Sequence, residues 1–67
     1  MEWARTQNNL GLAWEFRPSV DARENLRLAI ECYGNALAVF TRERFPHYHA
    51  VVKGNLERAS GKLGEAE

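Results

Sequence analysis

Apolar side chains recur every three or four residues along nearly the whole of this 67-residue chain, which is the spacing of one face of an α-helix. No segment alternates between apolar and polar residues for long, and no Asn-Gly or Asp-Gly pair offers a hairpin turn. Two prolines, Pro18 and Pro46, divide the pattern into three parts. The sequence therefore predicts an all-α fold of three helices in antiparallel order.

The first helix is expected from about Glu2 to Phe16. Four side chains at spacings of four, three and four residues form a single stripe along it: Trp3, Gln7, Leu10 and Trp14. Arg17 precedes Pro18, and a residue in that position is pushed out of the α conformation. We therefore expect the helix to end there.

The second segment carries the most regular pattern. Asp21, with Glu24 three residues later, is typical of a helix start, where acidic groups meet the positive end of the helix dipole. Large apolar residues and small ones then follow in two parallel stripes: Leu26, Ile30, Tyr33, Leu37 and Phe40 in the first, and Ala22, Ala29 and Ala36 in the second. This combination allows another helix to approach closely. The pattern favours a long helix that continues through Arg44.

The third helix is expected to begin at Pro46, because proline suits the first helical position. Its apolar positions are less regular: Tyr48, Val51 or Val52, Leu56, Ala59 and Leu63. Gly61 and Gly64 weaken its end. We therefore expect one helical domain over residues 1–63 and a disordered tail over residues 64–67.

The third segment is similar to the first. Moving the chain against itself by 46 positions superimposes four identical residues: Ala4 on Ala50, Asn9 on Asn55, Leu10 on Leu56 and Ala13 on Ala59. These matches lie at helical spacing. The third segment therefore resembles a second copy of the first, and the three segments follow the order A-helix, B-helix, A-helix.

Two stretches resemble the tetratricopeptide repeat, a family of stacked helix pairs. The run from Asn9 to Trp14, with Leu-Gly followed by an aromatic residue three positions later, is similar to the first helix of that repeat. The run from Ala29 to Leu37 is similar to the second helix. The string from Trp3 to Gly11 resembles a bacterial long-repeat variant whose units read roughly FP-x-x-WA-x-TQNNLG, and Phe45-Pro46 provides the start of a second unit. The resemblance implies about one and a half repeats.

The chain also departs from the family pattern. Its period of 46 positions exceeds the usual repeat of about 34 residues. The second copy has Glu57 in place of the glycine and Ser60 where Trp14 would fall. A charged residue at Glu57 is consistent with a terminal capping helix whose outer side is exposed to water.

The resemblance implies a protein–protein interaction module. In peptide-binding members of the family, a basic residue and an asparagine one turn apart hold the carboxylate or the backbone of a peptide. Arg5 and Asn9 have this spacing, and Asn55 repeats the asparagine. The alternative is that Asn8 and Asn9 are ordinary exposed polar side chains of a helix, or that Asn9 bonds to a neighbouring turn.

Self-association is a second expectation. A chain this short buries a small core, and its first helix is apolar on more than one side. We expect a homo-oligomer, most simply a two-fold dimer, through a set of apolar residues of that helix: Trp3, Leu12, Trp14 and Phe16. A further alternative is that the chain is one part of a larger repeat array and has no function alone.

Charge and hydropathy argue against nucleic acid and membranes as partners. The formal net charge is zero, with nine Lys+Arg against nine Asp+Glu, and the arginines are scattered. Both features argue against nucleic acid, so a small helical DNA-binding protein is the weaker alternative. No stretch approaches the roughly 20 apolar residues that cross a membrane, and no secretory signal is evident. We expect a cytoplasmic protein.

No motif indicates catalysis. The sequence has no glycine-rich phosphate loop, no zinc-ligand spacing and no nucleophile elbow. His47 and His49 are two residues apart, so on a helix they point to different sides and do not form a metal site. Cys32 has no second cysteine to pair with and is expected to act as a small apolar residue. The sequence therefore predicts a non-enzyme without cofactor or metal.

Overall fold

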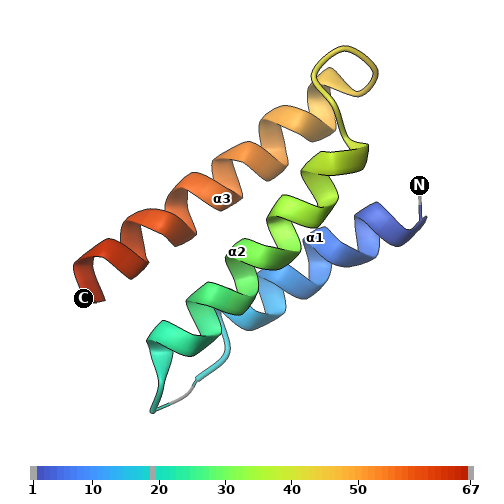
Figure 1. The fold of residues 1–67 in the computed structure, drawn as a ribbon. Coiled ribbons are helices and arrows are strands. Elements are labelled where there is room, and N and C mark those ends of the chain that lie inside the picture. Colours follow the sequence, from blue (N-terminus) through green and yellow to red (C-terminus); the bar gives the residue numbers. More distant parts are fainter. Residues whose placement is uncertain (1, 19, 67) are drawn as a thin grey trace.

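The computed structural model describes residues 2–18 and 20–66, which form three α-helices: α1 (Glu2–Glu15), α2 (Ala22–Val39) and α3 (Pro46–Ala66). Each helix runs antiparallel to the one before it (Figure 1). Within the described ranges the chain forms no strand. The predicted all-α fold of three helices is confirmed.

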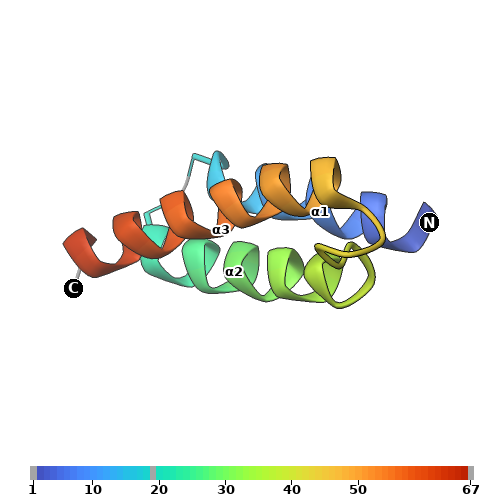
Figure 2. The same cartoon turned by 90° about the horizontal axis from the view of Figure 1, so that it is seen from above.

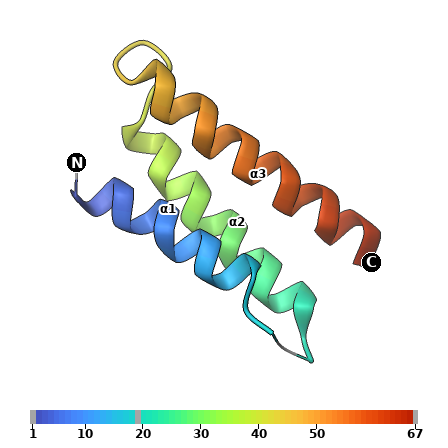
Figure 3. The same cartoon turned by 180° about the vertical axis from the view of Figure 1, so that it is seen from behind.

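The helices form two layers. α1 and α3 lie on the same side of α2, which packs against both (Figure 2). In the view from behind, α2 is seen between α1 and α3, along the line where those two helices lie next to each other (Figure 3). Contact between α1 and α3 is limited to a few positions. The middle helix therefore supplies most of the core.

The core follows the predicted pattern of α2. Eight buried apolar residues form one cluster: Ala4, Leu26, Ala29, Tyr33, Ala36, Phe40, Val52 and Ala59. Ile30 and Leu37 are half-buried and pack against it. The start of α2 is also as predicted, because the Asp21 carboxylate accepts a hydrogen bond from the backbone N–H of Glu24 at 3.1 Å.

The end of α2 differs from the prediction. The helix stops at Val39 and does not continue through Arg44. Phe40 is 1% exposed, and its ring is stacked on Tyr48 at 4.7 Å between centroids and meets Phe45 edge-on at 5.6 Å. Because both of these rings follow Phe40 in the chain, the backbone has to turn back between them. The aromatic cluster thus replaces the last turn of the expected helix.

The end of α3 also differs from the prediction. The helix continues to Ala66, beyond the point at which the sequence predicts a disordered tail over residues 64–67. Glu67 lies outside the described residues. Leu63 packs against the core and Lys62 forms an ion pair with Glu15. These contacts stabilise the turns that Gly61 and Gly64 would otherwise weaken.

The buried face of α1 consists of small residues. Ala4 and Gly11 face α2, and the side chain of Glu15 completes this face. Trp3 and Leu10, which belong to the predicted large stripe, are 54% and 43% exposed. The stripe therefore runs along the flank of α1, next to the core rather than in it.

The two helices related by the sequence repeat bury opposite faces. Residues buried in α1 are Ala4, Gly11 and Glu15, and the residues 46 positions later, Ala50, Glu57 and Gly61, are exposed. Residues buried in α3 are Val52, Asn55 and Ala59, and their counterparts Thr6, Asn9 and Ala13 are exposed. Similar sequences thus occupy different environments, and each helix leaves open the face that the other uses.

Candidate functional site

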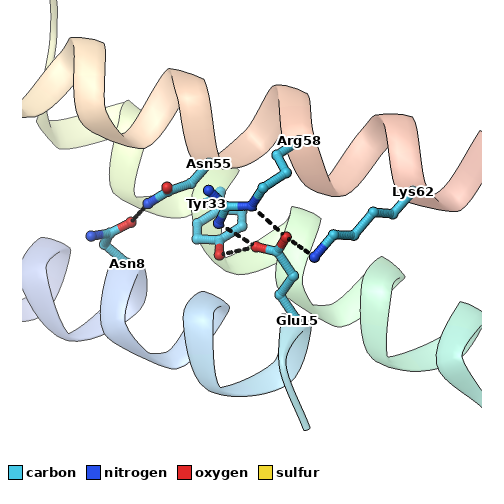
Figure 4. Close-up of polar contacts among 6 residues, drawn as sticks. All are labelled: Asn8, Glu15, Tyr33, Asn55, Arg58 and Lys62. Atoms are coloured by element: carbon cyan, nitrogen blue, oxygen red, sulfur yellow. Dashed lines mark hydrogen bonds and ion pairs between the residues drawn. The ribbon is translucent and has the colours of Figure 1, made fainter.

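A polar cluster among the described residues is centred on the carboxylate of Glu15, whose side chain is fully buried. Its Oε1 atom accepts hydrogen bonds from the Tyr33 hydroxyl and from an Arg58 Nη2 group, each at 2.7 Å. Its Oε2 atom accepts from Arg58 Nε at 2.7 Å and lies 2.8 Å from Lys62 Nζ (Figure 4). One carboxylate at the end of α1 therefore joins all three helices.

The pKa values of Glu15, Tyr33 and Arg58 are all shifted in this cluster. Burial alone would raise the pKa of Glu15, but the hydrogen bonds from Arg58, Lys62 and Tyr33 outweigh it and lower the pKa from 4.5 to about 2. Burial and the neighbouring carboxylate raise the pKa of Tyr33 well above its usual value. The bond to Glu15 raises the pKa of Arg58. The carboxylate therefore stays charged and the phenol stays neutral near neutral pH, which keeps the bonds between the three helices in place.

Phe16 lies beside this cluster. The Lys62 amino group is 4.2 Å and the Arg58 guanidinium 5.2 Å from the centre of its ring. Both cations therefore contact an aromatic face on one side and Glu15 on the other. Phe16 remains 59% exposed, in the region where α1 meets α3.

The second polar contact between α1 and α3 involves asparagines. Asn55 donates from its side-chain amide to Asn8 Oδ1 at 3.0 Å (Figure 4). Asn55 is buried, whereas Asn9 is exposed on α1. The exposed Arg5 bonds to Glu2, one turn before it. The three residues predicted to bind a partner are thus not brought together: Arg5 and Asn9 remain open to solvent, and Asn55 takes part in an internal contact.

The residues predicted to form an oligomer interface lie on two surfaces. Trp3 is exposed at the beginning of α1, on the flank that also carries Leu10. Leu12 and Trp14 are half-buried and pack against the core, and the Arg17 guanidinium lies 5.2 Å from the centre of the Trp14 ring. Phe16 faces the cations of α3. The four residues therefore do not form one continuous patch.

A shallow depression opens at the other end of the molecule, where the first turn of α1 meets the connection between α2 and α3. It has a volume of about 100 Å³, is open to solvent, and is lined by Glu2, Arg5, Phe40 and Tyr48. Tyr48 is 39% exposed. The depression therefore combines an aromatic floor with one charged pair at its rim.

Cys32 and His49 both contact the folded core or its backbone. Cys32 is buried, and burial together with Glu31 raises the pKa of its thiol. His49 Nδ1 lies 3.1 Å from the Phe40 carbonyl oxygen. Over residues 2–18 and 20–66, no three His, Cys, Asp or Glu side chains are grouped so that they could hold a metal ion. In the same part of the chain, no helix has the length and apolar content needed to cross a lipid bilayer.

The Glu15 cluster is not predicted by the sequence patterns. Its one signal is the spacing of Ala4, Gly11 and Glu15, which places an acidic residue on the small face of α1. No protein-family model matches the chain, and it has no significant match among curated proteins or solved structures.

Proposed function

We propose that this chain is a non-catalytic protein-interaction module related to the tetratricopeptide repeat, and that it binds an extended peptide at the depression beside Arg5. The sequence motifs described above support the relationship. The observation that carries the binding role is the depression itself, which Arg5 and the partly exposed Tyr48 line together, with the buried ring of Phe40 beneath. A peptide with an apolar side chain close to a carboxylate complements this surface.

The charged pair at the rim does not block such a ligand. Arg5 and Glu2 are bonded to each other, but their side chains are 57% and 82% exposed. An exposed pair of this kind contributes at most about 1 kcal/mol. A ligand carboxylate can therefore replace Glu2 as the partner of Arg5, and Asn9, one turn further along α1, offers an amide for the peptide backbone.

A displayed library of random peptides tests this role. We expect the wild-type chain to enrich peptides with a carboxylate next to a large apolar residue, and the Arg5→Ala, Asn9→Ala double variant to lose this enrichment at least tenfold. Arg23→Ala, which removes an exposed arginine of α2, is the matched control and should enrich the same peptides. Equal enrichment by the double variant and the wild type would remove the binding site from this surface.

A second candidate role is that of one unit in a longer array of repeats. The exposed face of α3, with Ala50, Glu57 and Gly61, corresponds to the face that α1 buries against α2. In a stack, another helix like α2 would cover it. A chain in which residues 1–45 are duplicated before residues 46–67 tests this idea. A higher melting temperature than that of the single chain supports stacking, and an unchanged or lower one contradicts it.

A further inference from the structure

The flank of α1 that faces away from α3 carries exposed apolar side chains. Trp3 is 54% and Leu10 is 43% exposed, and Trp14 is half-buried on the same flank. Gln7, which lies between the tryptophans, accepts a hydrogen bond at 3.1 Å from Asn35 of α2. Asn8, on the other side of α1, bonds to α3. The Trp3–Trp14 flank therefore follows the outer edge at which α1 meets α2.

The spacing of this flank is the same when read from either end. Trp3, Gln7, Leu10 and Trp14 follow one another at intervals of four, three and four residues, with tryptophan at both ends. Suppose that two copies of α1 lie antiparallel, with a two-fold axis between residues 8 and 9. Trp3 of each copy then faces Trp14 of the other, and Gln7 faces Leu10. A surface that complements itself in this way is what a two-fold interface requires.

The charges at the ends of the flank favour the same arrangement. Glu2 precedes the flank and is exposed, and Arg17 follows it and is exposed as well. An antiparallel arrangement brings the end of α1 that carries Glu2 in one copy close to the end that Arg17 follows in the other. It also places the N-terminal end of each helix beside the C-terminal end of the other, so that opposite ends of the two helix dipoles are adjacent. A parallel arrangement would place like charges side by side.

The length of α1 limits the area that the contact can bury. A standard stable interface buries about 800 Å² on each partner, which is roughly a fifth of the 4455 Å² surface of this chain. The 14 residues of α1 give a helix about 21 Å long. The contact therefore needs the whole flank and the adjacent edge of α2. Leu28, which the Gln7–Asn35 bond places level with Trp14, is half-buried there.

We infer that the Trp3–Trp14 flank of α1 is a homodimer interface, in which a second copy of the chain binds antiparallel about a two-fold axis. This interface extends both layers of the fold. The two α1 helices meet in one layer, and the two α2 helices lie beside each other in the other layer. It lies on the opposite side of α1 from the α1–α3 contact, so it goes beyond the proposed peptide site and does not depend on it.

Sedimentation velocity between about 2 and 200 µM tests the interface. The mass of the wild-type chain is expected to rise from 7.7 kDa toward twice that value across this range. Leu10→Glu is expected to weaken dimerisation at least tenfold. Val51→Glu introduces the same charge at an apolar position of α3. Val51 is 44% exposed and Leu10 is 43% exposed, and the Val51 variant should dimerise like the wild type. Circular dichroism of each variant shows whether it is folded.

Several outcomes would overturn the inference. A wild-type chain that stays at 7.7 kDa up to 200 µM has no such interface, and another partner would then have to cover the flank. A loss of dimer in Val51→Glu but not in Leu10→Glu would place the interface elsewhere. Neither result bears on peptide enrichment by the Arg5 surface, so the two proposals fail separately.

Disulfide cross-linking tests the direction of the helices. In a Cys32→Ala background, Gln7→Cys places two thiols within about 5 Å of each other along the helix axis, because residue 7 is close to the two-fold axis. Trp3→Cys places them about 16 Å apart. Cross-linking of the first variant alone is the expected result. Equal cross-linking of both variants indicates parallel helices and contradicts the inference, as does the absence of cross-linking in both.

Discussion

The aromatic ring of Tyr33 occupies the space in which a side chain on Gly11 would lie. Its Cε1 and Cδ1 atoms are 2.5 Å and 2.7 Å from the position that a Cβ atom on Gly11 would take. The hydroxyl of the same ring reaches Glu15, one turn further along α1, at 2.7 Å. Gly11 therefore allows α1 to approach α2 closely enough for Tyr33 to bond to the buried carboxylate.

Gly11→Ala is expected to destabilise the chain by about 1–3 kcal/mol. Alanine is a better helix former than glycine by about 1 kcal/mol, but here its Cβ atom would overlap the Tyr33 ring. The ring is fully buried and cannot move without displacing its neighbours. Urea unfolding followed by circular dichroism measures the change in the free energy of unfolding.

Gly54→Ala and Gly61→Ala provide the matched controls. A Cβ atom at either position has open space around it, and both residues lie in the interior of α3. Each substitution should therefore stabilise the chain by about 0.5–1 kcal/mol through helix propensity alone. A stabilising effect of Gly11→Ala would show that Tyr33 does not need the glycine.

Glu15→Gln is expected to destabilise the chain by about 2–3 kcal/mol. Glutamine keeps the size of the side chain but removes the charge that Arg58 and Lys62 face. Breaking a fully buried ion pair costs more, but both cations are partly exposed and water can solvate them in the variant. The change in the urea midpoint at a constant slope measures the effect. A shift below about 0.5 kcal/mol would mean that the carboxylate does not hold the helices together.

Stability is expected to fall in acid because of the same group. The pKa of Glu15 is about 2 in the folded chain and close to 4.5 in the unfolded chain, so the unfolded chain binds more protons between these values. The stabilisation is therefore complete above about pH 5 and is lost as the pH falls toward 2. The difference corresponds to about 3 kcal/mol at about 1.4 kcal/mol per pKa unit. Thermal unfolding between pH 2 and 6 should show this loss, and Glu15→Gln should flatten it.

The sequence predicts the parts of the fold that depend on local periodicity. In α2, the regular spacing of Leu26, Tyr33 and Phe40 predicts the buried face correctly, because these residues lie along one face of the helix and belong to the one core cluster that α1 and α3 also enter. The N-cap at Asp21 is also evident, since it requires only a side-chain oxygen three residues before a backbone N–H.

Features that depend on contacts between helices are not evident from the sequence. In α1 the largest side chains, Trp3 and Leu10, form the clearest stripe, yet the buried face is that of Ala4 and Gly11. The reason is the bulk of Tyr33, which comes from another helix and selects the small face. The Glu15 cluster is hidden for a similar reason, because its donors come from residues 18 and more than 40 positions away.

Tyr33→Phe is expected to cost about 1–2 kcal/mol. Phenylalanine keeps the ring against Gly11 but removes the hydroxyl that donates to Glu15 Oε1. The carboxylate then has one donor fewer, so its pKa should rise and the acid loss of stability should begin at a higher pH. Unfolding curves at pH 7 and pH 3 measure both effects. An unchanged acid limb would show that the hydroxyl does not contribute to the pKa of Glu15.

Arg58 and Lys62 should respond differently to exchange of one cation for the other. Arg58 donates two bonds to Glu15, one to each oxygen, and its planar group lies near the Phe16 ring. Lysine carries its charge at a single point and cannot form both bonds in parallel, so Arg58→Lys should cost about 1 kcal/mol. Lys62 makes a single contact with Oε2, which arginine can also make, so Lys62→Arg should change stability by less than about 0.5 kcal/mol. Urea unfolding of the two variants gives the comparison. Equal losses of unfolding free energy in the two variants would mean that only the positive charge of the partners of Glu15 matters, and not the geometry of their hydrogen bonds.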